Sequence, residues 1–373
     1  MIYLDNAATT FPKPRSVIDG TLECIKKYCG NPGRSSHRLS AKISEKIYET
    51  REAIADFLGS DSPENVVFCQ NATHALNIAI KTTIEPDTHV LISDLEHNSV
   101  LRPINALVRK NRVRYSVFGT EGDIEDNIPK LIRDDTKYIV TTLASNVIGR
   151  EIPLKKLSAI SKRYNLTLIT DSSQLLGHKT VNLSETPCAV LCAPAHKALF
   201  GIQGAGFALF SDNLKRETLF EGGSGSDSKN LLMPDVLPER FEAGTIPSPS
   251  VVSLLYGIEF IKKIGIHEIE NKIIRLADRY VELISSCKNA TLYEHGNGVV
   301  SFNVGDVPSS VIAEEFSKSG VCIRGGLHCA PLAHKSIGTL ERGTARISVS
   351  YLNELKECDR FYQVLCSVCR KYC

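Results

Sequence analysis

The sequence predicts an α/β fold in which a large domain with a mainly parallel sheet is joined to a smaller α+β domain. Short runs rich in β-branched residues alternate with helical segments up to about residue 246, and this pattern is typical of a parallel sheet covered by helices. The order of elements changes after the proline-punctuated segment around Pro247. At 373 residues, the chain also exceeds the size at which one hydrophobic core usually stops growing.

An amphipathic helix is expected first, from about Ser40 to Gly59. Its apolar residues recur at helical spacing, with a serine before them and a glycine after them. Beyond this helix, short apolar runs predict the strands of the large sheet at residues 66–68, 90–92, 138–140, 166–170, 189–191 and 207–210.

The segment 222–228 is rich in glycine and serine and lacks periodicity, which predicts a mobile loop or an excursion from the sheet, compatible with a lid or a subunit contact. After Pro247 the order changes, and we expect a helix at 250–264, a strand at 299–304, a helix, a strand at 345–349 and a final helix. These patterns predict a large domain at 15–246, a small domain at 247–373, and a segment 1–14 that packs with the small domain.

Composition excludes several classes of protein. Apolar residues make up 42% and charged residues 23% of the chain, as in ordinary globular proteins. The net charge of +2 gives no electrostatic reason to expect nucleic acid or a membrane surface as partner. No signal peptide or membrane span is apparent, so we expect a cytoplasmic protein whose twelve cysteines are mostly reduced and buried.

Polar side chains are expected at the carboxyl end of the strand that closes at Thr170, where open α/β sheets usually bind ligands. Asp171 stands there and Gln174 follows three residues later. A carboxylate at this place can pair with the protonated ring nitrogen of a cofactor. The alternative is an aspartate that caps the next helix.

A lysine follows the next strand in the run Ala195-His196-Lys197, ahead of a glycine-rich segment. An amine that is partly desolvated there can form a covalent bond with a cofactor's aldehyde. The alternative is a solvated surface lysine. The presence of Asp171 at the end of the preceding strand favours the interpretation that Lys197 binds a cofactor.

Two further strand ends carry candidate binding groups. Ala72 and Thr73 begin a helix, where free backbone N–H groups and the threonine hydroxyl make a site for a phosphate, unless Thr73 is simply a helix cap. His97 lies just past the strand at 90–92, and its imidazole can lie flat on an aromatic ring, although a lone histidine is more often structural.

Three more blocks surround these elements: YLDNAATT at residues 3–10, SNVIG at 145–149 and FEAGT at 241–245. In this order and spacing, the blocks resemble the class V aminotransferase superfamily along nearly the whole chain. The resemblance implies the fold type I of pyridoxal-phosphate (PLP) transferases. It also implies a homodimer, because such enzymes complete their sites across a two-fold interface.

The resemblance assigns roles to individual residues. Lys197 is expected to hold PLP covalently, Asp171 to meet the pyridine nitrogen and His97 to stack on the ring. Gln174 and Asn146 are expected to reach the ring hydroxyl. The implied phosphate contacts are Ala72, Thr73, His196 and, from the second subunit, Thr245.

The segment SGVCIRGGLHCAP at residues 319–331 resembles the nucleophile loop of the shorter-loop branch of cysteine desulfurases, similar to selenocysteine lyases. A thiolate that attacks a substrate sulfur must ionise and approach on a flexible loop, which Cys329 can do beside Arg324 and His328. The alternative is a buried structural cysteine, which fits poorly next to Gly325-Gly326. Leu327 departs from the branch, where a second histidine is common.

Two other residues are candidates for substrate contacts. Arg346 stands at the start of a predicted strand, and its guanidinium can clamp an α-carboxylate, which is the role the resemblance assigns; the alternative is a surface ion pair. Further candidate substrate contacts are Arg324, Asn146 and His37. His37 is included because its region lines the substrate entrance in similar enzymes.

The C-terminal segment has a cysteine pattern that the family does not share. Cys366, Cys369 and Cys373 fall on one face of a terminal helix, eight and more residues after Cys358. The pattern is compatible with a buried seam and with a metal site or persulfide relay, and our site prediction includes no metal.

The sequence thus favours a PLP-dependent cysteine desulfurase that converts L-cysteine to L-alanine and passes sulfur from Cys329 to an acceptor protein. A selenocysteine lyase acting on L-selenocysteine is a near twin that the sequence does not separate from it. A class V aminotransferase or lyase without persulfide chemistry and a catalytically idle scaffold are also compatible with the sequence.

Overall fold

The computed structural model describes residues 1–33, 37–211, 217–225 and 229–372. The last three residues of the predicted loop 222–228 lie outside this part, as does Cys373 of the C-terminal cysteine pattern. Within the described part, no helix combines the length and the apolar character that a membrane crossing requires.

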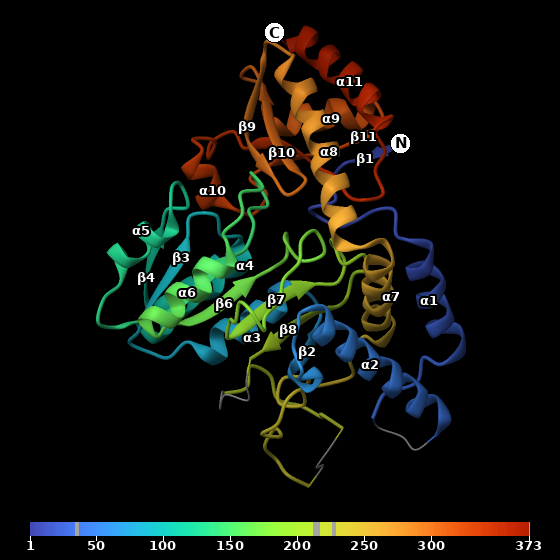
Figure 1. Ribbon diagram of the computed structural model, residues 1–373, viewed down its shortest axis with the longest axis vertical. Coiled ribbons are helices and arrows are strands. Elements are labelled where there is room, and N and C mark those ends of the chain that lie inside the picture. The colour runs from blue at the N-terminus through green and yellow to red at the C-terminus, as the bar shows by residue number, and fades with distance from the viewer. Residues whose placement is uncertain (34–36, 212–216, 226–228, 373) are drawn as a thin grey trace.

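A seven-stranded sheet forms the centre of the larger half of the molecule (Figure 1). The strand order is β2-β8-β7-β6-β5-β3-β4, and the pairs among β7, β6, β5, β3 and β4 are all parallel. Only β8 runs antiparallel to both of its neighbours. The strands are β2 (Val66–Cys69), β3 (His89–Ser93), β4 (Arg114–Phe118), β5 (Thr136–Thr142), β6 (Thr167–Asp171), β7 (Val190–Pro194) and β8 (Gly206–Phe210).

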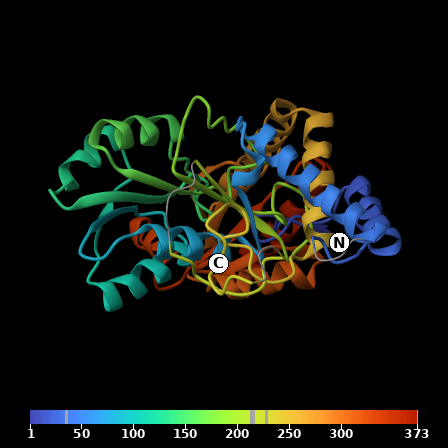
Figure 2. The same ribbon diagram turned by 90° about the horizontal axis from the view of Figure 1, so that it is seen from below.

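Helices cover both faces of this sheet, as the view from below shows (Figure 2). Consecutive residues of one strand enter different cores: Val66 and Phe68 of β2 pack into one, and Val67 and Cys69 into the other. Burial on both faces explains the continuous apolar runs that predicted these strands. The helices of this half are α1 (Arg15–Lys27), α2 (Arg38–Phe57), α3 (Ala72–Thr83), α4 (Asn98–Asn111), α5 (Ile124–Asn127), α6 (Leu154–Tyr164) and α7 (Ser248–Ile264).

A second, antiparallel sheet of order β12-β13-β10-β9 lies in the upper part of Figure 1, with helices packed against it. This mixture of sheet and helices matches the α+β pattern predicted for the C-terminal part. Its elements are α8 (Ile266–Ser285), β9 (Ala290–Gly296), β10 (Val299–Val304), α9 (Ser309–Lys318), β11 (Val321–Cys322), β12 (Arg324–Gly326), α10 (Pro331–Ser336), β13 (Thr344–Ser348) and α11 (Glu357–Tyr372).

The N-terminal segment joins this second half. Strand β1 (Ile2–Tyr3) pairs in parallel with β11, and Asp5 bridges to Ser348 of β13. The sequence places the domain boundary near Pro247, yet α7, which begins directly after it, packs against α1 and α2. The elements that pack with the second sheet begin with α8, directly after Gly265. The domain limits stay a prediction.

Candidate active site

A cavity of about 210 Å³ lies at the carboxyl ends of β5, β6 and β7, where residues of both sheets meet. This is the edge at which parallel sheets bind their ligands. Eleven of the residues singled out in the sequence line the cavity: Ala72, Thr73, His97, Asn146, Asp171, Gln174, His196, Lys197, Arg324, His328 and Arg346.

Asp171 ends β6 and is 3% exposed. Its Oδ1 accepts a hydrogen bond of 2.9 Å from the backbone N–H of Ser173, which fixes the carboxylate at the cavity wall. Gln174 follows in the same turn, and its Nε2 donates to the carbonyl of Ala7 at 3.1 Å. The N-terminal block is therefore part of the same wall.

Lys197 follows β7, is half-buried and lines the cavity. Burial lowers the pKa of its amine to about 8, although the nearby carboxylate of Asp171 acts in the opposite direction. A sizeable fraction of the amine is then neutral, and so nucleophilic, near neutral pH. The preceding residue is tied down because the carbonyl of His196 accepts hydrogen bonds from Thr10 and Lys13.

Helix α3 points its N-terminus at the cavity. Asn71 caps the helix by accepting a 2.9 Å hydrogen bond from the N–H of His74, and Ala72 and Thr73 of the first turn line the cavity. First-turn N–H groups have no carbonyl partner within their own helix, so they favour an anion. Gly206 of β8 permits this approach, because a Cβ there would lie 2.7 Å from the backbone carbon of Asn71.

His97 caps α4, with its Nδ1 accepting a hydrogen bond of 3.0 Å from the N–H of Ser99. Burial, with a further contribution from Lys197, lowers the pKa of this imidazole to about 4, so the ring is neutral at pH 7. A neutral ring can stack on an aromatic cofactor without placing a charge against it.

The neighbouring residue, Glu96, was not predicted from the sequence. Its side chain is fully buried, and its carboxyl accepts hydrogen bonds from the backbone N–H of Thr142 and from Ser93. Burial raises the pKa of this carboxyl to about 8. The one signal in the sequence is the position of Glu96 directly before His97, and this position does not indicate that the Glu96 side chain is buried.

Arg346 of β13 is 1% exposed, and its Nη2 donates to Oδ1 of Asp5 at 2.6 Å. Its Nη1 donates to the carbonyl of Asn146 at 2.8 Å. The Nε of Arg346 has no hydrogen-bond partner within the described part of the chain. A buried arginine beside the cavity with one free N–H can bind a carboxylate there.

Cys329 occupies an exposed loop at the rim of this site. His328 and Cys329 have φ angles of 48° and 58°, so two successive non-glycine residues are left-handed, a conformation that costs free energy and often marks functional loops. Cys329 lines an adjoining groove of about 340 Å³ that shares Thr73, His97 and Ser99 with the central cavity.

Two contacts hold the loop that carries Cys329 against the large sheet. The N–H of Asn98 donates to the carbonyl of Cys329 at 2.7 Å, and Nδ2 of Asn146 donates to that of His328, also at 2.7 Å. The His328 ring is buried and its Nε2 donates to the Thr344 carbonyl at 3.0 Å, while burial holds its pKa far below the usual range. His328 is therefore a neutral group.

Three residues of interest lie elsewhere. His37 is exposed at the start of α2, where its Nδ1 accepts a hydrogen bond from Ser40, and it does not line the cavity of its own chain. Thr245 is likewise exposed and outside the cavity lining. Leu327, which replaces the histidine common in the similar branch, is 40% exposed.

A lysine amine, a buried carboxylate and a helix N-terminus that converge at the carboxyl edge of a parallel sheet define a cofactor-dependent α/β enzyme. The chain belongs to the aminotransferase class-V family, whose model matches residues 2–361. Members of this family depend on PLP.

Relatives and solved structures agree with this assignment. The chain is 28% identical over 368 residues to a probable cysteine desulfurase of Methanothermobacter thermautotrophicus, covering 95% of this chain and 92% of that one. It is 27% identical to a cysteine desulfurase of Pectobacterium atrosepticum, with 96% and 91% covered. The apo cysteine desulfurase of Thermococcus onnurineus superposes with a TM-score of 0.91 at 28% identity, covering 99% of this chain and 95% of that one.

Proposed function

We propose that this chain is a PLP-dependent cysteine desulfurase, which converts L-cysteine to L-alanine and receives the sulfur on Cys329 as a persulfide. The observation that carries the proposal is the position of Cys329, exposed on a left-handed loop whose groove adjoins the cavity of Lys197 and Asp171. The similarity to proteins named cysteine desulfurases supports it.

The cavity fits PLP in its donor set. The amine of Lys197 suits the aldehyde, Asp171 the ring nitrogen and the N-terminus of α3 the phosphate. The buried Nδ1 of His196, in the cavity wall, has no partner among the described residues, as expected of a group that serves a ligand. When bound, PLP supplies an electron sink for bond changes at the substrate's α-carbon.

The chain's own groups then orient the amino acid. Arg346 and Arg324, opposite each other on paired strands, would bind the substrate α-carboxylate. Asp5 and the Asn146 carbonyl hold the Arg346 guanidinium in place for this task. The low pKa of the Lys197 amine, about 8, suits it to take up and return the α-proton near neutral pH.

Cys329 performs the sulfur transfer. Its thiolate forms an S–S bond to the substrate sulfur while the substrate's Cβ–S bond breaks, and the product carbon is protonated to give alanine. Arg324 lies on β12, directly before the loop that carries Cys329, and lines the cavity. A thiol acceptor, which we expect to be a protein, would then remove the outer sulfur by exchange.

The decisive experiment is a product assay on Cys329→Ser, in protein whose PLP content has been measured. We expect the variant to keep its cofactor and to form neither alanine nor persulfide. Cys322 lies nearby in the sequence, on β11, and does not line the cavity. The variant Cys322→Ser is therefore the matched control and should retain activity. Alanine and sulfide formation by Cys329→Ser at the wild-type rate would refute the persulfide route, and faster turnover of L-selenocysteine would identify the lyase instead.

We further propose that the enzyme is a homodimer in which Thr245 completes the cofactor site of the second copy. Its exposure outside its own cavity supports this arrangement. Leu231 and Leu232 are 99% and 78% exposed and provide apolar surface for an interface. Light scattering should show a dimer for the wild type and a monomer for Leu231→Glu/Leu232→Glu.

A further inference from the structure

A pair of thiols lies outside the active site, where the end of α8 meets α11. The Sγ atoms of Cys287 and Cys366 are 3.9 Å apart although the two residues are 79 positions apart in the sequence. Cys369, one turn along α11, also contacts the Cys287 thiol. Nothing in the proposed desulfurase chemistry uses these cysteines.

The pair belongs to a regular helix contact. The ring of Tyr280 on α8 meets that of Phe361 on α11, with centroids 5.0 Å apart. Further along, the Ser286 hydroxyl donates to the Tyr362 hydroxyl at 3.2 Å, and the two thiols follow. The two contacts that precede the thiols on both segments hold the end of α8 against α11, and the two sulfur atoms lie next to each other where this contact continues.

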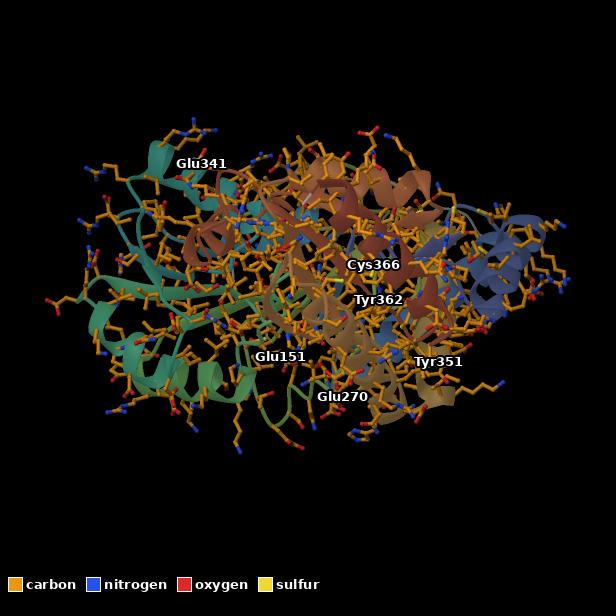
Figure 3. The ribbon with its side chains drawn as sticks, turned by 90° about the horizontal axis from the view of Figure 1, so that it is seen from above. Glu151, Glu270, Glu341, Tyr351, Tyr362 and Cys366 are labelled. Atoms are coloured by element: carbon orange, nitrogen blue, oxygen red, sulfur yellow. The ribbon has the colours of Figure 1, made fainter. Side chains whose placement is uncertain are left out.

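The two thiols differ in access. Cys287 is 9% exposed, whereas Cys366 is half-buried and lies on α11 beside Tyr362 at the surface seen from above (Figure 3). Burial and the neighbouring Cys366 thiol raise the pKa of Cys287 to about 12. Because Cys366 is the more exposed thiol, a reagent from solution meets it first. Once the Cys366 sulfur is bonded to another sulfur it no longer ionises, and its contribution to the raised pKa of Cys287 is lost.

We propose that Cys366 and Cys287 form a redox modification site that takes low-molecular-weight disulfides, with Cys366 as the entry thiol and Cys287 as the resolving thiol. The Cys366 thiolate attacks the small disulfide, forms a mixed disulfide and releases one small thiolate. Cys287, as its thiolate, then attacks the Cys366 sulfur and displaces the second small thiolate. Two protein thiols are oxidised and one small disulfide is reduced to two small thiols, which take up the two protons that the protein thiols lose.

The product would join the end of α8 covalently to the last helix. Because Sγ atoms at 3.9 Å must approach to about 2.05 Å in a disulfide, only a small local shift is needed. Cys358, earlier on α11, is 1% exposed and faces the core, so it serves as a matched cysteine with no part in the exchange.

The test is incubation of the reduced full-length protein with oxidised glutathione, followed by alkylation and peptide mass spectrometry. In the wild type and in Cys358→Ser, we expect the Cys287–Cys366 disulfide. In Cys287→Ser, the glutathione adduct should accumulate on Cys366. In Cys366→Ser, Cys287 should be recovered alkylated after denaturation, without an adduct.

Two outcomes would overturn the proposal. One is a wild-type bond between Cys366 and Cys369, or no bond at all at this site. The other is a glutathione adduct on Cys287 in Cys366→Ser, because Cys287 would then be an entry thiol in its own right. Circular dichroism of each serine variant, compared with the wild type, separates these outcomes from misfolding.

Discussion

The guanidinium of Arg346 donates a hydrogen bond of 2.6 Å to the carboxylate of Asp5, across 341 positions of the sequence. The Arg346 side chain is 1% exposed and that of Asp5 is 21% exposed, so a largely buried ion pair joins the N-terminal block to the second sheet. Removal of Asp5 would leave the buried Arg346 guanidinium without its charge partner, which costs free energy. Arg346 lines the cavity, and its Nε has no hydrogen-bond partner among the described residues.

The first prediction concerns carboxylate binding by this arginine. Arg346→Lys keeps the positive charge but loses the planar fork, so the KM for L-cysteine should rise on the order of 10- to 100-fold. Steady-state kinetics measure this change. Arg342→Lys is the control, because Arg342 is an exposed residue whose guanidinium binds the Tyr293 hydroxyl, and its KM should equal that of the wild type. An unchanged KM in Arg346→Lys would contradict the assigned role.

Local patterns predicted the strands that are buried on both faces, because an unbroken apolar run leaves little choice of structure. Strand β4 was missed: in RYSVF, only Phe118 is buried, as befits an edge strand. The small-domain strand β9 was missed for the same reason, since its residues are all partly or fully exposed.

The candidate site was predictable where a residue follows a strand or stands in a recognisable block. Asp171, Lys197 and His97 come together because parallel strands end at one edge. Contacts between distant segments carry no local signal. The Asp5–Arg346 pair and the approach of Cys287 to Cys366 therefore appear only in the folded chain.

The second prediction concerns the approach of α3 to the cavity. Gly206→Ala places a Cβ 2.7 Å from the Asn71 backbone and 2.9 Å from the Ala193 carbonyl, so the start of α3 must move. We expect the free energy of unfolding to fall by about 1–3 kcal/mol and PLP to bind more weakly.

Chemical denaturation and PLP titration of the apoprotein measure these two effects. Gly119→Ala is the matched control, because a Cβ at Gly119 meets no atom within 4 Å. Equal PLP affinity in Gly206→Ala and Gly119→Ala would show that the helix N-terminus does not hold the phosphate.

The third prediction is the pH dependence of cofactor capture. The neutral amine of Lys197 attacks the aldehyde, and burial lowers the pKa of this amine to about 8. The rate at which apoprotein captures PLP should therefore rise about tenfold per pH unit below 8 and level off above it. Stopped-flow absorbance measures the rate.

Replacing Asp171 tests the cause of this midpoint. The Asp171 carboxylate favours the charged amine, so Asp171→Asn should shift the midpoint to lower pH. The surface variant Asp61→Asn should leave it unchanged. A midpoint near 10 in the wild type would mean that Lys197 is not desolvated.

The last prediction concerns the buried carboxyl of Glu96, whose pKa is raised by burial from 4.5 to about 8. Between these values, the folded protein binds more protons at this site than the unfolded chain. The site's contribution to stability is therefore lost as pH rises from about 4.5 to 8, by up to about 1.4 kcal/mol per pH unit, and is constant outside this window.

Glu96→Gln removes the titration of this carboxyl. The free energy of unfolding of the variant, relative to that of the wild type, should therefore increase steadily over that pH range in urea denaturation. Glu64→Gln, at an exposed position, should follow the wild type at every pH. Parallel curves for Glu96→Gln and wild type would mean that Glu96 is already ionised in the folded protein.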